Sequence, residues 1–131
     1  GRNPVIIYMA LHAKEKGVKI IALTNLTYSK TVTSRHTSGL RLFETADIVI
    51  DNHGEIGDAA CTIPDVEQKV GPTSTVVGAT ILNAIIVEVC QKLKEVGVDY
   101  PPIFYSANLD GGDELNQSLF EKYQEAIHYQ L

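Results

Sequence analysis

The stretch "NPVIIYMALHAKEKGVKIIALTN" (residues 3–25) decides the fold class. Asn3 is a favourable N-cap and Pro4 suits the first position of a helix, so we predict a helix over residues 4–16. The run that follows, residues 18–25, is apolar and rich in β-branched side chains, which is the pattern of a parallel strand covered on both faces. A helix that leads directly into such a strand indicates an α/β protein.

The rest of the chain continues this alternation. The predicted elements are a polar loop over 26–39, a short helix over 39–46, strands over 47–51 and 60–63, a loop over 64–75, a long helix from about 76 to 96, an extended segment over 101–108 and a helix over 113–130. Right-handed crossovers then give a parallel sheet with helices on both faces. We therefore expect one domain over residues 1–131, a three-layer α/β/α sandwich.

The apolar content of the helices is large for this sheet. The first helix is apolar nearly all round, so we expect it to be buried on more than one side. Three short strands make a narrow sheet for so much apolar helix. We therefore expect an amino-terminal portion of the domain to be missing from this sequence.

Composition excludes several classes of protein. The net charge is -5, and the 11 Lys and Arg residues form no basic stripe, which argues against nucleic acid as a partner. No apolar run reaches the roughly 18 to 20 residues of a membrane span. Cys61 and Cys90 stand in apolar surroundings without CxxC spacing, so we expect two reduced core thiols and no metal site. These features favour a cytoplasmic protein.

Hydroxyl groups gather where ligands bind in open α/β sheets, beyond the carboxyl ends of the strands. Thr24 and Asn25 end the first strand and a Thr- and Ser-rich loop follows them. Two helix starts could bind an anion through free backbone N–H groups and the helix dipole. Their residues are Gly1, Arg2 and Asn3 before the first helix, and Thr73, Ser74 and Thr75 before the long one. The same residues could equally be helix caps alone.

Two side chains could act as a general base. His36 lies in the Thr- and Ser-rich loop, and Glu67 lies in the predicted loop before the long helix. A carboxylate there could move a proton if burial raised its pKa. Both residues could also be ordinary surface residues. Motifs for phosphate loops, dinucleotide binding, zinc proteolysis and α/β-hydrolase catalysis are absent from the sequence.

Four segments in the same order resemble the sugar isomerase (SIS) domain family. They are "GRNPVIIYMALHAKEKGVKIIALTN", "SGLRLFETADIVIDN", "GPTSTVVGATILNAIIVEV" and "PPIFYSANLDGGDELNQSLFEKY". The likeness is strongest to uncharacterised bacterial proteins described as phosphosugar-binding or phosphoheptose-isomerase-like. It implies a flavodoxin-like sandwich with a five-stranded parallel sheet. It also implies that a strand and the two serines of the family's S-x-S-G pattern stand before Gly1.

The resemblance implies a phosphosugar-binding domain that needs no metal or cofactor. It places Glu67 where some members have an acid–base carboxylate, and it implies a homo-oligomer, a dimer or a tetramer. Asn3 replaces a commoner Thr, and no catalytic histidine can be aligned. The residues that it assigns to the sugar's phosphate are Gly1, Asn3, Ser38, Thr73, Ser74 and Thr75.

Three functional hypotheses follow. The first is a phosphosugar-binding domain, either with binding alone or with aldose–ketose isomerase activity in which Glu67 or His36 is the base. The second is a non-catalytic sensor or regulatory module that holds a sugar phosphate. The third is a structural α/β domain that mediates interactions.

Overall fold

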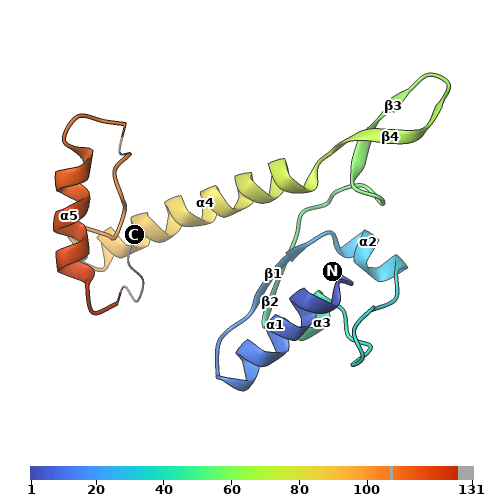
Figure 1. Cartoon of the computed structure of the whole chain (residues 1–131), viewed down its shortest axis with the longest axis horizontal. Helices are drawn as coiled ribbons and strands as arrows, with labels where there is room; N and C mark the ends of the chain where they lie inside the picture. Colours follow the sequence, from blue (N-terminus) through green and yellow to red (C-terminus); the bar gives the residue numbers. More distant parts are fainter. Residues whose placement is uncertain (107, 127–131) are drawn as a thin grey trace. The chain divides into compact units, whose positions relative to one another are not determined.

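The computed structural model describes residues 1–106 and 108–126 of the chain (Figure 1). The chain divides into two units, Gly1–Ala84 and Ile85–Leu131, which are considered separately below. The elements in chain order are α1 (Pro4–Glu15), β1 (Ile21–Thr24), α2 (Leu26–Thr31), α3 (Leu42–Thr45), β2 (Ile48–Asp51), β3 (Ala59–Ile63), β4 (Val66–Pro72), α4 (Ser74–Glu95) and α5 (Gly112–Tyr123).

Helix α1 forms where its cap predicts it. The side chain of Asn3 accepts a hydrogen bond from the Val5 N–H at 2.9 Å, which satisfies one of the free donors of the first turn. The expected burial is wrong, however. Ile7 and Ala10 are the buried residues of α1, whereas Tyr8 is 62% exposed. One face of the helix packs on α3, and its other apolar side chains face outward.

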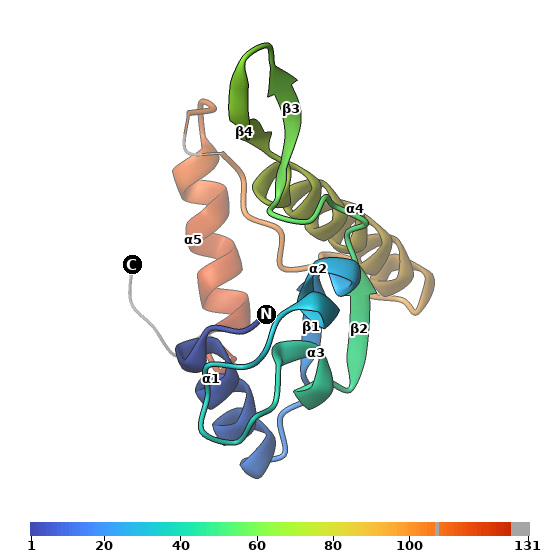
Figure 2. The same ribbon diagram turned by 90° about the vertical axis from the view of Figure 1, so that its right-hand side faces the viewer.

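Strands β1 and β2 pair in parallel, from Ile21 opposite Ile48 to Thr24 opposite Asp51. This pairing confirms a parallel sheet within an α/β chain. Because the register is in step, both strands reach their carboxyl ends at the same edge. Figure 2 shows them side by side with α3 near the sheet.

The third predicted strand does not join this sheet. β3 forms, but it pairs antiparallel with β4, which occupies most of the stretch predicted as a loop. A turn at Pro64 and Asp65 joins the two strands, and Asp65 adopts a left-handed φ of 61°. Such a turn permits a hairpin between neighbouring strands, whereas a parallel strand needs a crossover. The described residues therefore form two sheets of two strands, and the predicted single sheet is wrong.

The first six residues of the predicted polar loop form a helix, α2. The Asn25 side chain caps it by accepting a hydrogen bond from the Tyr28 N–H at 2.8 Å. At its carboxyl end, Arg41 Nη1 donates to the carbonyl oxygens of Ser29 and Lys30, each at 3.3 Å. Arg41 lies more than ten residues after Ser29 and Lys30 in the chain, so the sequence around α2 gives no sign of this contact.

The core of residues 1–84 is small and partly polar. Its apolar members are Ile7, Ala10 and Ala22, and buried hydroxyl groups of Thr24, Ser29 and Thr45 accompany them. Both cysteines are free thiols. Cys61 is exposed on β3, so the prediction that it belongs to the core is wrong.

Residues 85–126 contain the end of α4, an extended segment and α5. Asn116 of α5 fixes the segment, since its side chain accepts from the Tyr105 N–H at 2.7 Å and donates to the Tyr105 carbonyl at 2.9 Å. Phe104 packs on Phe120 with ring centroids 4.9 Å apart. The helix predicted over 113–130 runs to Tyr123, and residues 127–130 lie outside the described part of the chain.

Helix α4 begins two residues before its predicted start, and it corrects the expectation that no apolar run reaches the length of a membrane span. All of its residues are described, and none of them is buried. By length and composition it could cross a membrane, although the core helices of water-soluble proteins meet the same criterion. A single helix of this kind is weak evidence for a membrane span.

Candidate functional site

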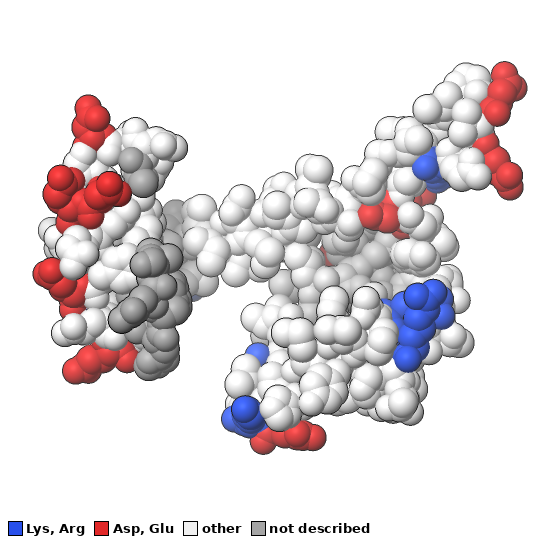
Figure 3. Space-filling view, viewed as in Figure 1, with Lys and Arg blue, Asp and Glu red and all other residues white. Residues whose placement is uncertain are grey.

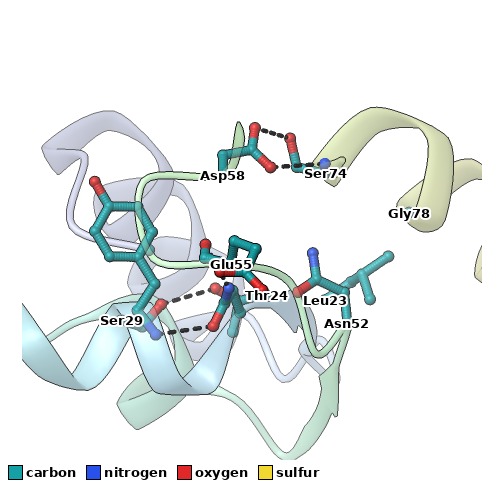
Figure 4. A pocket seen from close by; sticks show the side chains of 11 residues that line it. Leu23, Thr24, Ser29, Asn52, Glu55, Asp58, Ser74 and Gly78 are labelled. Atoms are coloured by element: carbon teal, nitrogen blue, oxygen red, sulfur yellow. Dashed lines mark hydrogen bonds between the residues drawn. The ribbon is translucent and has the colours of Figure 1, made fainter. Parts of the chain in front are cut away.

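A polar cavity of about 340 Å³ opens at the carboxyl ends of β1 and β2 (Figure 4). This is the edge where open α/β sheets bind ligands. Strand β1, helices α2 and α4, the loop over 52–58 and Gly1 contribute to it. Its lining residues are Gly1, Leu23, Thr24, Asn25, Tyr28, Ser29, Asn52, Glu55, Asp58, Ser74 and Gly78.

One wall of the cavity is a pair of buried hydroxyl groups. Thr24 Oγ1 and Ser29 Oγ lie 2.9 Å apart and share one hydrogen bond. Gly1 lies directly against them, since a Cβ at Gly1 would stand 3.1 Å from Ser29 Oγ. The start of α1 is thereby held beside the end of β1. The Gly1 carbonyl accepts a bond from the Leu42 N–H at 2.8 Å, which fixes this approach.

Amide and carboxylate side chains tie the two strand ends to α2. Asp51 Oδ1 accepts from the Leu26 N–H at 3.1 Å, which joins the end of β2 to the start of α2. Asn25 Nδ2 donates to the Glu55 carbonyl at 3.1 Å. These two hydrogen bonds hold the lining residues that follow β1 and β2 in place, because the parallel register brings the carboxyl ends of the two strands side by side.

Asp58 occupies the amino-terminal end of α4. Its Oδ1 accepts from the Ser74 N–H at 2.7 Å and from the Thr73 N–H at 3.1 Å, and its Oδ2 lies 2.7 Å from Ser74 Oγ. The hydrogen bond from the Ser74 hydroxyl, with the backbone N–H bonds, lowers the pKa of Asp58. A carboxylate of the protein therefore stands where the sequence predicted a phosphate.

Glu55 is the second carboxylate of the cavity. Lys69 of β4 contacts its Oε2 at 3.2 Å, and the Glu55 side chain is 56% exposed. Among the described residues, no hydrogen bond to Glu55 Oε1 is present. This oxygen is free to accept a hydrogen bond from a ligand.

Arg2 carries a buried donor without an acceptor. Its Nε is buried and has no hydrogen-bond partner in the described part of the chain. A buried polar group without a partner is costly, and more so when it is charged. Arg2 directly follows Gly1, which lines the cavity. Arg2 itself is not among the residues that line the cavity.

The structure brings two of the predicted phosphate-binding residues, Gly1 and Ser74, to the cavity. Thr73 lies behind Ser74, where its Oγ1 donates to the Asp58 carbonyl at 3.1 Å. Asn3 is the cap of α1, and Thr75 belongs to the first turn of α4 without lining the cavity.

The other predicted residues lie elsewhere in residues 1–84. Ser38 Oγ is 2.8 Å from His36 Nδ1 in an exposed loop. His36 lines a separate depression with Tyr8. Glu67 is an exposed residue of β4. None of the three lines the polar cavity, and their proposed roles remain predictions.

Sequence reasoning missed Glu55, Asp58, Tyr28 and Ser29 as members of the site. The available signal was the acidic pair within "NHGEIGD", which stands in the loop directly after the predicted strand over 47–51. For metal binding, no group of three or more His, Cys, Asp or Glu residues that could hold an ion occurs among residues 1–106 and 108–126.

Comparison with known proteins finds similar proteins whose names state no activity or ligand. No protein-family model matches the chain. It is 54% identical over 129 residues to a UPF0309 protein of Shouchella clausii, 57% identical over 129 residues to one of Oceanobacillus iheyensis and 52% identical over 127 residues to one of Geobacillus thermodenitrificans. These matches cover 97–98% of this chain and 51–52% of each relative. The chain therefore spans about half the length of these curated relatives.

These findings correct the resemblance to the SIS family. No model of that family matches, and the relatives carry the name UPF0309, which states no activity or ligand. The described sheets have two strands each and one of them is antiparallel, in contrast to the five-stranded parallel sheet that the resemblance implied.

Proposed function

We propose that the chain binds a sugar phosphate in the cavity at the carboxyl ends of β1 and β2. The observation that carries the proposal is the convergence of hydroxyl, amide and carboxylate groups there. A volume of about 340 Å³ lies in the range of small-molecule sites. Hydroxyl, amide and carboxylate side chains provide the donors and acceptors that a polyhydroxylated ligand requires.

The phosphate fits the α1 side of the cavity better than the α4 side. The start of α4 is already neutralised by Asp58. At the start of α1, the helix dipole and the Thr24–Ser29 hydroxyl pair both favour an anion. The sugar would then extend toward Asn52 and Glu55, with the Tyr28 ring as an apolar surface.

A thermal-shift experiment tests this proposal. Glucose 6-phosphate, glucosamine 6-phosphate and sedoheptulose 7-phosphate are added to the 131-residue chain, with the unphosphorylated sugars as controls. A ligand at 100 times its Kd stabilises the folded chain by about 2.7 kcal/mol, so we expect a rise in melting temperature of several degrees with at least one phosphate.

Two variants locate the binding. Thr24→Val removes a hydroxyl group of the cavity wall and should reduce the shift, whereas Ser118→Ala on α5 should leave it unchanged. The proposal is wrong if no sugar phosphate raises the melting temperature, or if Thr24→Val responds like the parent chain.

A second candidate function is interconversion of aldose and ketose phosphates, and Glu55 is the observation that favours it. A carboxylate with a free oxygen in the cavity could remove the proton from C2 and deliver one to C1, while a second proton passes from O2 to O1. The test is deuterium incorporation at C1 or C2 of hexose phosphates in D₂O. If Glu55→Gln exchanges deuterium as fast as the parent chain, Glu55 is not the base. If the parent chain exchanges none, binding without catalysis is the better description.

The oligomeric state, the partners and the cellular compartment of the protein belong to the same proposal. We propose a cytoplasmic homo-oligomer that binds neither nucleic acid nor membrane, and a three-layer α/β/α arrangement around β1 and β2. Figure 3 shows the Lys and Arg side chains of residues 1–84 in small separate groups on the visible face.

On α4, Leu82, Ile86 and Val89 follow one another at spacings of four and three and are 54%, 59% and 44% exposed. This is the repeat that pairs helices, so α4 is the element we assign to self-association.

A further inference from the structure

Among the described residues, the outer edge of β4 has no partner strand. β4 pairs with β3 along one side, in a sheet of two strands (Figure 1). The N–H and C=O groups along the edge of a sheet can form hydrogen bonds with another strand. All seven residues of β4 are exposed, and a two-stranded hairpin alone is at best marginally stable in water. The edge of β4 can therefore take a further strand.

The middle of β4 is only partly paired with β3. Cys61 lies opposite Val70 and Ile63 lies opposite Val66, so β4 has three residues between these pairs where β3 has one. A bulge of this kind leaves residues of the longer strand without a partner in the ladder. The backbone groups of these residues are therefore available to a strand outside the hairpin. The three residues are Glu67, Gln68 and Lys69.

The sequence of this edge, "VEQKV" over residues 66–70, complements a second copy that runs in the opposite direction. With a two-fold axis at Gln68, Glu67 lies opposite Lys69 of the partner subunit, and the valines at the two ends of the stretch lie opposite each other. Opposite charges directly across from each other stabilise a pair of strands, whereas like charges destabilise it. A parallel contact in register would set each charge opposite its own kind. The charges therefore favour an antiparallel contact between two identical edges.

We infer that β4 binds β4 of a second copy of this chain, antiparallel and about a two-fold axis at Gln68. The two hairpins then form one sheet of four strands, which is wide enough to be stable where a lone hairpin is marginal. Lys69 is available for the contact, since an ammonium group has three N–H donors and Glu55 takes one of them at 3.2 Å. The contact is separate from the one assigned to α4 and does not depend on the sugar phosphate.

Sedimentation equilibrium of the full chain at low ionic strength tests the inference with two charge reversals. Glu67→Lys and Lys69→Glu each set like charges opposite each other twice in a dimer. Each should raise the dissociation constant of the dimer about tenfold or more, because two attractive pairs become repulsive. Asp110→Lys is the matched control. It changes the net charge as Glu67→Lys does, at an exposed residue outside the hairpin, and should leave the dissociation constant unchanged.

An equimolar mixture of the two reversed chains separates this contact from one through α4. In a mixed dimer, the two positive charges of one β4 lie opposite the two negative charges of the other. The mixture should therefore associate at least as tightly as the parent chain. Association through α4 alone predicts no such recovery, because the reversed charges lie outside that helix.

A cysteine at the two-fold axis gives an independent measurement. Gln68→Cys, in a chain that also carries Cys61→Ser, should form a disulfide between two copies under mild oxidation, because the two thiols meet at the axis. Thr62→Cys in the same chain should not, since the two β3 strands lie about 14 Å apart across a sheet of four strands.

Three results would each overturn the inference. They are a mixture that associates no more tightly than the single variants, a dissociation constant that neither reversal raises, and cross-linking of Gln68→Cys no faster than that of Thr62→Cys. A parent chain that is monomeric at every concentration overturns it as well. Sugar-phosphate binding is unaffected by all of these results.

Discussion

At the scale of single residues, the hydroxyl groups of Thr24 and Ser29 depend on each other. Both are buried, and each is the other's hydrogen-bond partner at 2.9 Å. We expect Ser29→Ala to destabilise the chain by about 1–2 kcal/mol, because it leaves the buried Thr24 hydroxyl without that partner. Thr24→Val combined with Ser29→Ala should cost less than the sum of the single changes. Urea unfolding of the three variants measures this, and strictly additive costs would contradict it.

Glu44 carries a pH dependence of stability. Arg41 contacts both of its carboxylate oxygens, at 2.9 and 2.8 Å, and these side-chain bonds lower the pKa of Glu44 to about 2. An unfolded glutamate titrates near about 4.3, so the unfolded chain binds more protons in this range. The contribution of the pair is therefore present above about pH 4.5 and is lost as the pH falls toward 2.

Replacing Glu44 tests this dependence. Glu44→Gln should lose less stability than the parent chain between pH 5 and pH 3, as measured by urea unfolding at each pH. Glu95→Gln, at the exposed end of α4, serves as the control and should follow the parent curve. A Glu44→Gln curve parallel to that of the parent would exclude the ion pair as the cause.

At the scale of elements, Asp58 stabilises the start of α4 from sixteen residues away. It accepts bonds from two backbone N–H groups of the helix start that otherwise have no helical partner. Asp58→Ala should lower the melting temperature by roughly 4 °C and speed amide exchange in the first turn of α4. Asp99→Ala changes an exposed aspartate and should do neither. Unchanged exchange in Asp58→Ala would show that the helix start is stable without this cap.

The elements also differ in how far sequence could predict them. α1 was found because its cap and first residue are adjacent in the chain, and β1 and β2 because apolar β-branched runs are local signals. β4 was missed because all of its residues are exposed, so burial imposes no alternation on its sequence. The carboxyl end of α2 was missed because Arg41, a distant residue, supplies its hydrogen bonds.

At the scale of the whole molecule, we expect the chain to associate with itself through α4. Its exposed leucine, isoleucine and valine side chains would otherwise face water, which costs about 25 cal/mol per Å² of apolar area. Light scattering after size-exclusion chromatography should give the mass of a dimer or a tetramer. Leu82→Lys with Ile86→Lys should lower that mass, whereas Thr80→Lys should not. A parent chain that is monomeric at every concentration would rule out this role of α4.

The sequence by itself determined the helix that begins at Pro4, the two apolar strands, and the gathering of hydroxyl groups at a strand end. These features depend on neighbouring residues, through caps, propensity and hydrophobic periodicity, and a single chain displays them directly. Only the tertiary structure decided that β3 pairs with β4, that Asp58 fills the start of α4, and that Glu55 lines the cavity while Glu67 does not. These outcomes depend on contacts between residues distant in the chain, whose geometry no local pattern encodes.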